Sequence, residues 1–122
     1  MTSRRVFILN LHELRWEEKE DMSVERQAPA CGRIENFATG KEEVVVGGGY
    51  YHGYLSSVEI YSVLDDIWRQ GTPLPQKIGY ASYLPFEDSF IIIGGRGSSP
   101  LDTIYKVIIE IFVIYKSLNS CL

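Results

Sequence analysis

The sequence has few of the residues from which metal sites and disulfides are built. It contains two cysteines and two histidines among 122 residues. Cys121 is the penultimate residue, where chains fray, so no structural disulfide with Cys31 is expected. His12 and His52 lie far apart and neither belongs to a tight ligand spacing. We therefore predict no metal site and no cofactor.

The charge and the hydrophobic runs exclude further classes of protein. The formal net charge is -4, without the basic stripe that neutralises phosphates. The apolar run after Arg4 and Arg5 ends after four residues, whereas a signal peptide needs about 7 to 15. Residues 104–115 are the most apolar segment, but they include Lys106 and Glu110 and fall short of the roughly 18 residues of a membrane span. We expect a cytoplasmic protein that binds neither nucleic acid nor membrane.

An internal repeat organises what is present. The segment EEVVVGGG (residues 42–49) aligns with SFIIIGGRG (residues 89–97), which places Gly47 and Gly48 on Gly94 and Gly95 with a period of 47 residues. Two strand-like runs precede each glycine pair, the second of them ending at the pair, and two follow it. Four short strands per period is the number in one blade of a β-propeller.

The strand-like runs are short and rich in β-branched and aromatic residues, which favours strands over helices. One segment, residues 12–26 (HELRWEEKEDMSVER), contains many helix formers, but its apolar residues do not keep a 3.6-residue stripe. Strands are favoured there, and a helix is the alternative. The expected strands are at about residues 6–11, 15–20, 30–36, 43–47, 57–63, 67–70, 80–84, 89–94, 103–107 and, with the weakest pattern, 111–115.

A recurring spacing of large apolar residues connects the last two strands of each period. Six residues lie between Tyr61 and Trp68, and the same spacing separates Leu9 from Trp16 and Tyr105 from Phe112. We predict that each pair lies on neighbouring strands joined by a turn and packs one blade against the next, since such rings bury about 150 to 250 Å² each.

An apolar strand, Gly-Gly, a variable loop, Tyr, six residues and Trp together resemble the kelch repeat. The resemblance covers about residues 6–107, and Phe112 replaces the tryptophan of the third unit. It implies an all-β fold: a fragment of a kelch-type β-propeller with four-stranded antiparallel blades and an incomplete ring. The implied structural-motif residues are Trp16, Gly47, Gly48, Tyr61, Trp68, Gly94, Gly95 and Tyr105.

The implied organisation is the end of a first blade (1–25), a complete blade (26–75), a partial blade (76–116) and a disordered tail (117–122). Kelch propellers close with about 4 to 8 blades, and this chain holds about two and a half. The resemblance therefore implies either a piece of a longer propeller or assembly with further copies.

The resemblance also implies the function. Kelch propellers bind partner peptides through loops that share one face, so we expect a non-catalytic protein-interaction module, one form of which is the substrate-recognition part of a ubiquitin-ligase adaptor. The alternatives are a fragment of a galactose-oxidase-like propeller enzyme, a truncated product without activity of its own, and loop residues that are merely solvated. The candidate partner-binding residues are Arg26, Gln27, Tyr50, Tyr51, His52, Gln76, Lys77, Arg96, Ser98 and Ser99.

Overall fold

The computed structural model describes residues 1–86, 89–97, 103–108 and 111–116, with side chains described for residues 1–84 and 91–97. Every regular element within these ranges is a β-strand, so the predicted all-β fold class is confirmed. This part of the chain therefore has no helix long and apolar enough to cross a bilayer.

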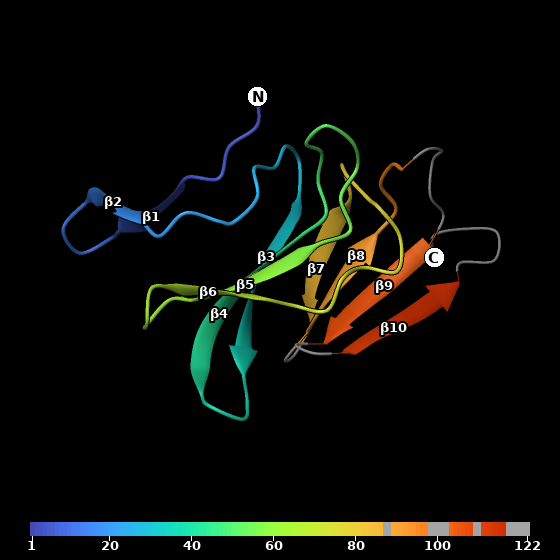
Figure 1. Ribbon diagram of the computed structural model, residues 1–122. Helices are drawn as coiled ribbons and strands as arrows, with labels where there is room; N and C mark the ends of the chain where they lie inside the picture. The colour runs from blue at the N-terminus through green and yellow to red at the C-terminus, as the bar shows by residue number, and fades with distance from the viewer. Residues whose placement is uncertain (87–88, 98–102, 109–110, 117–122) are drawn as a thin grey trace.

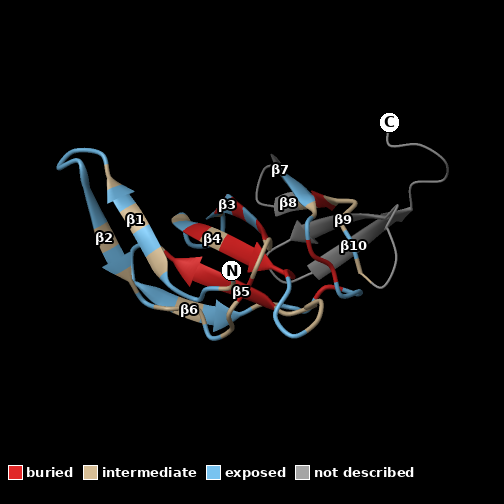
Figure 2. Ribbon diagram, turned by 90° about the horizontal axis from the view of Figure 1, so that it is seen from above, coloured by how far each residue is buried: buried red, intermediate tan, exposed pale blue. Residues whose placement is uncertain are grey.

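Three antiparallel sheets stand side by side along the molecule (Figures 1 and 2). The first is a two-stranded hairpin, and each of the other two is a four-stranded sheet in which neighbours in sequence are neighbours in space. The described strands do not close into a ring. The first sheet contains β1 (Val6–Asn10) and β2 (Arg15–Lys19); the second β3 (Ala30–Asn36), β4 (Lys41–Gly47), β5 (Val58–Ser62) and β6 (Ile67–Gln70); the third β7 (Ser82–Phe86), β8 (Ser89–Ile93), β9 (Thr103–Ile108) and β10 (Ile111–Lys116).

The main core lies between the second and third sheets. Along β3, Ala30 and Ile34 are buried while Cys31 and Arg33 on the opposite face are exposed, which is the alternation expected of a strand with one covered face. The strong red colour of β4 and β5 in Figure 2 marks the same burial. The members of this core are Ala30, Ile34, Val45, Val58, Ile60, Leu74, Ile78 and Ile92, with Ala81 packed against them.

The glycine pairs that turn the chain after β4 and β8 are Gly48–Gly49 and Gly94–Gly95. Their φ angles are 66° and 100° in the first pair and 67° and 97° in the second. A Cβ atom on Gly48 would lie 2.2 Å from the carbonyl oxygen of Ile78, so only glycine fits there. The predicted alignment of Gly47 with Gly94 is wrong by one residue, because Gly47 is the last residue of β4.

Strand register also corrects the third aromatic pair. In the second sheet Val46 pairs with Glu59, and in the third Ile92 pairs with Tyr105. Because Gly47 and Ile93 both immediately precede their glycine pairs, Tyr105 corresponds to Glu59 and not to Tyr61. Tyr105 and Phe112 lie on the neighbouring strands β9 and β10, as predicted, but they are not opposite each other, because Phe112 pairs with Val107.

The predicted pairing of Tyr61 with Trp68 across β5 and β6 is confirmed. Their ring centroids are 4.9 Å apart, and Tyr61 is 1% exposed. The Tyr61 hydroxyl donates a 2.6 Å hydrogen bond to Asp66 Oδ1, and Trp68 Nε1 donates a 2.8 Å bond to the carbonyl of Glu20. The Tyr61 bond fixes the turn between β5 and β6, and the Trp68 bond holds the second sheet to the chain that leaves the first sheet.

Trp16 holds the same register position in the first hairpin, opposite Leu9, but it does not pack between sheets. It is 68% exposed and Leu9 is 38% exposed. The prediction that Trp16 joins two blades is wrong for the part of the chain that the structure describes, because no sheet covers that face of β1 and β2.

The interface between the first and second sheets is incompletely filled. A gap of about 330 Å³ remains there, and its lining is mainly apolar. Residues from β1, including Val6 and Ile8, line one side, and Cys31, Val44 and Val46 line the other. The gap lies beside β3 and β4 of the second sheet. The first sheet has two described strands where the second has four, so no described strand of the first sheet lies opposite β3 and β4.

Candidate partner-binding loops

The loops that link β4 to β5, one sheet to the next, and the end of β8 are joined by backbone hydrogen bonds. Gln27 and Tyr50 exchange two such bonds of 2.9 and 2.8 Å, and Gly79 and Arg96 exchange two of 2.8 and 2.7 Å. The N–H of Tyr80 donates to the carbonyl of Ala28 at 3.0 Å, which connects the two bridges. The predicted residues Gln27, Tyr50 and Arg96 therefore belong to one continuous set of loops.

Figure 1 shows where this set of loops lies relative to the sheets. The β4–β5 loop (green) stands at the opposite end of the second sheet from the β3–β4 hairpin turn, and the chain that enters β7 (yellow) reaches the same end. We call the residues of this end, 26–28, 48–55, 76–81 and 94–97, the loop face. Loops carried on a rigid scaffold of strands are a usual location of binding residues.

Aromatic side chains are concentrated on the loop face. Tyr50 and Tyr51 are 39% and 37% exposed, and His52 is also exposed. The rings of Tyr50 and Tyr54 meet edge to face, with centroids 5.3 Å apart, and those of Tyr51 and His52 meet similarly at 4.4 Å. Their mutual contacts hold these rings in place, so a partner would meet a partly ordered aromatic surface.

The loop face also carries two cationic side chains. Lys77 and Arg96 are exposed, as is Gln76, and neither cation forms an ion pair with any residue that the structure describes. Both are thus available to an acceptor on a partner. The predicted residues Ser98 and Ser99 lie outside the described residues.

Arg26 is not available to a partner, which corrects its place among the predicted binding residues. It is 4% exposed, and its Nη2 lies 2.9 Å from Glu59 Oε2 in an ion pair whose side chains are 0% and 1% exposed. Its guanidinium also donates to the carbonyls of Gly48 and Ser57 at 2.8 and 3.0 Å. Arg26 therefore anchors the link between the first two sheets to the start of the β4–β5 loop.

Glu59 is the other half of this anchor. Burial raises the pKa of the Glu59 carboxyl, but hydrogen bonds from the Ser23 backbone and from Arg26 outweigh burial and hold the pKa below its ordinary value. The carboxylate is therefore charged at neutral pH and compensates the buried guanidinium. Removing either partner would leave the other as an unpaired buried charge.

Sequence reasoning missed three residues of this region. Tyr80 is 53% exposed and accepts a 3.1 Å hydrogen bond from Gln27 Nε2, and Tyr54 packs against Tyr50. The run YYHGY contained a signal for Tyr54. Nothing in the sequence marked Glu59, because its partner Arg26 lies 33 residues away.

The described residues contain no group of three or more His, Cys, Asp and Glu side chains that could hold a metal ion. Residues 38–75, from the β3–β4 turn to the chain that follows β6, match the family model of the Kelch motif. Residues 38–75 are a kelch repeat. The resemblance inferred from Gly-Gly, Tyr61 and Trp68 is thereby confirmed for this unit. No curated protein matches the chain.

Kelch repeats are typically non-catalytic and in general mediate protein–protein interaction, so the kelch repeat indicates an interaction module. In this chain the kelch repeat supplies the β4–β5 loop with its tyrosines and the buried Glu59 beneath it.

Proposed function

We propose that this protein binds a segment of a partner protein through the loop face. The observation that carries the proposal is the continuous backbone bridging from Tyr50 through Gln27 and Tyr80 to Arg96, which presents exposed tyrosines and exposed cations together. Tyr and Arg are the residue types most often found as energetic anchors in interfaces. A fixed backbone beneath them lowers the entropy lost on binding.

A peptide selection against the full chain tests this proposal. Peptides enriched from a displayed library would be measured against the protein by isothermal titration calorimetry. Tyr50→Ala and Arg96→Ala should each weaken binding by about tenfold or more. Matched controls at other surfaces are Phe37→Ala, an exposed ring in the β3–β4 turn, and Arg33→Ala, an exposed arginine of β3. Equal losses in the control variants would refute the proposed surface.

We further propose that the protein acts in the cytoplasm and that its described sheets are completed by further blades, from a longer chain or from other copies. The exposed apolar face of the first sheet supports the second statement: Phe7, Leu9 and Trp16 are 46%, 38% and 68% exposed. Light scattering on the purified chain tests the supply of blades from other copies, and a monomer without exposed-surface dye binding would contradict the need for completion.

A narrower form of the proposed function is substrate recognition for a ubiquitin ligase, which rests on the kelch resemblance alone. The protein should then co-purify from cells with both a ubiquitin ligase and a substrate of that ligase. Arg96→Ala should abolish co-purification of the substrate and leave that of the ligase unchanged. The galactose-oxidase-like alternative predicts stoichiometric bound copper, which metal analysis of the purified protein would detect.

A further inference from the structure

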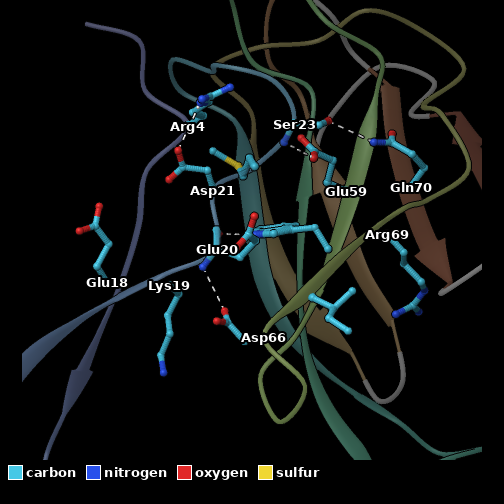
Figure 3. Close-up of a pocket in the computed structure, with 13 residues that line it drawn as sticks. Arg4, Glu18, Lys19, Glu20, Asp21, Ser23, Glu59, Asp66, Arg69 and Gln70 are labelled. Atoms are coloured by element: carbon cyan, nitrogen blue, oxygen red, sulfur yellow. Dashed lines mark hydrogen bonds and ion pairs between the residues drawn. The ribbon is translucent and has the colours of Figure 1, made fainter.

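A second surface, separate from the loop face, lies where the outer strands of the first two sheets approach each other. A groove of about 1020 Å³ runs between the segment 18–23, which ends β2 and leaves it, and the segment 66–70, which contains β6. In Figure 3, Glu18, Lys19 and Asp21 lie on one side of this space and Arg69 and Gln70 on the other. We call it the outer groove.

Hydrogen bonds join the two sides of the outer groove and fix their relative position. Glu20 N–H donates to Asp66 Oδ1 at 3.0 Å, and Trp68 Nε1 donates to the Glu20 carbonyl at 2.8 Å. Gln70 Nε2 donates to Ser23 Oγ at 3.2 Å. Since these bonds join the two sheets, the groove is formed before any ligand arrives, and binding would not have to order its walls.

One wall of the outer groove is a free sheet edge. Among the described strands, β6 pairs only with β5. The N–H of Gly71 donates to the carbonyl of Val58, and antiparallel bonding alternates along the strand, so the backbone groups of Trp68 and Gln70 face away from β5. An extended chain can add to such an edge through main-chain hydrogen bonds.

The charged side chains of the outer groove determine which kind of partner segment it can bind. The lining includes five carboxylates and three cationic side chains. Each of the three cations is already in an ion pair: Arg4 with Asp21 at 3.3 Å, Lys19 with Glu17 at 3.0 Å and Arg69 with Glu43 at 2.9 Å.

Two of the carboxylates, those of Glu20 and Asp66, form no ion pair within the part of the chain that the structure describes. Hydrogen bonding from the Tyr61 hydroxyl lowers the pKa of Asp66, so that carboxyl is charged at neutral pH. Both acidic residues border the half-buried Trp68, whose indole ring is also able to attract a cation.

We propose that the outer groove binds an extended basic segment of a partner protein, which adds to the free edge of β6 and places a lysine or arginine beside Trp68, between Glu20 and Asp66. The free edge supplies main-chain affinity, and the two carboxylates, which form no ion pair among the described residues, supply specificity for a cationic side chain. This site differs from the loop face in position and in sign of charge, so one chain would engage two segments of opposite character.

A peptide titration tests the proposal with the full chain. The probe is a fluorescein-labelled peptide of about ten alternating lysine and threonine residues, a length that spans an edge strand, and the comparison peptide has glutamate in place of lysine. Fluorescence anisotropy should show saturable binding of the lysine peptide that weakens as salt is raised, and no binding of the glutamate peptide. Binding of both peptides, or of neither, overturns the proposal.

Variants then separate the groove from general charge attraction. Glu20→Gln should weaken lysine-peptide binding by about fivefold or more. Glu35→Gln, an exposed glutamate of β3 outside the groove, makes the same change in net charge and should leave binding unaltered. Arg96→Ala on the loop face should also have no effect. Equal weakening by Glu20→Gln and Glu35→Gln would overturn the proposal while leaving the loop-face function intact.

Discussion

Replacing Trp68 with alanine should destabilise the protein far more than the same change at Trp16, although the two residues hold the same position in their hairpins. Full burial makes a tryptophan-to-alanine change cost about 3 to 5 kcal/mol. Trp68 is half-buried, so we take about 2 kcal/mol for its lost burial. Loss of the ring contact with Tyr61 adds about 0.5 to 1.5 kcal/mol.

The hydrogen bond from Trp68 Nε1 to the Glu20 carbonyl contributes roughly a further 0.5 kcal/mol, since the carbonyl becomes accessible to water once the ring is removed. The total for Trp68→Ala is thus about 3 to 4 kcal/mol. Trp16 is 68% exposed and no sheet among the described strands covers it, so Trp16→Ala should cost less than about 1 kcal/mol at a protein concentration at which the chain is monomeric.

Urea unfolding followed by far-ultraviolet circular dichroism measures both variants, because this signal does not depend on the tryptophan that is removed. The expected result is a midpoint shift to lower urea for Trp68→Ala at an unchanged slope, with little shift for Trp16→Ala. Equal losses of unfolding free energy in the two variants would refute the reasoning. It would mean that the first sheet does not protect Trp68, or that Trp16 is buried in solution by assembly.

Three further predictions concern Gly48 in the turn after β4, Arg26 in the link between the first two sheets, and Tyr61 in β5. Gly48→Ala should cost at least about 3 kcal/mol of unfolding free energy, because the new Cβ meets a backbone carbonyl. Gly40→Ala, also at positive φ but in open space, should cost about 1 kcal/mol. Similar urea midpoints for the two variants would contradict this prediction. Arg26→Met should cost about 3 to 5 kcal/mol, since Glu59 is left as an uncompensated buried charge, and a loss under about 1 kcal/mol in the same assay would show that the pair is solvated. Burial and the adjacent Asp66 raise the pKa of Tyr61, so the native state retains a proton that the unfolded chain releases above about pH 10. The stability of the folded protein should therefore fall as pH rises past that value. Tyr61→Phe should flatten the alkaline part of a profile of melting temperature against pH, and an unchanged profile would contradict the prediction.

The positions of the strands could be predicted from the sequence because each depends on local pattern. β-Branched and aromatic runs bounded by turn residues predicted every strand of the second sheet to within about two residues. The pairing of Tyr61 with Trp68 followed from the same reasoning, since a four-residue turn between them fixes the register. The match of residues 38–75 to the Kelch motif lies where this pattern is clearest.

The errors arose where neighbouring residues are chemically alike. Three successive glycines follow Val46, and composition alone could not tell which two adopt positive φ. Tyr105 was placed at the Tyr61 position by its aromatic character, but backbone pairing puts Val107 there. A shift of two residues along a strand keeps a side chain on the same face, so alternation offers no warning of this error.

At the candidate site, too, some features could be predicted from the sequence and others could not. The loops could be chosen from the sequence, because glycine-rich and polar segments between strands lie on the surface. Arg26 was misassigned because the sequence shows an arginine in such a link without showing Glu59 beneath it. The outer groove had no sequence signal, since its walls come from two sheets and are joined by bonds such as that between Trp68 and Glu20, 48 residues apart.

The sequence by itself determined that this chain forms short antiparallel strands in a repeated order, because periodic burial and turn residues act over a few neighbours. Only the tertiary structure decided which equivalent residues are covered. Trp68 is half-buried while Trp16 is exposed, and Arg26 is buried while Arg96 is exposed. The physical reason is that burial depends on whether another sheet packs against a residue. Among the described residues, another sheet covers one face of each hairpin but does not always cover the opposite face.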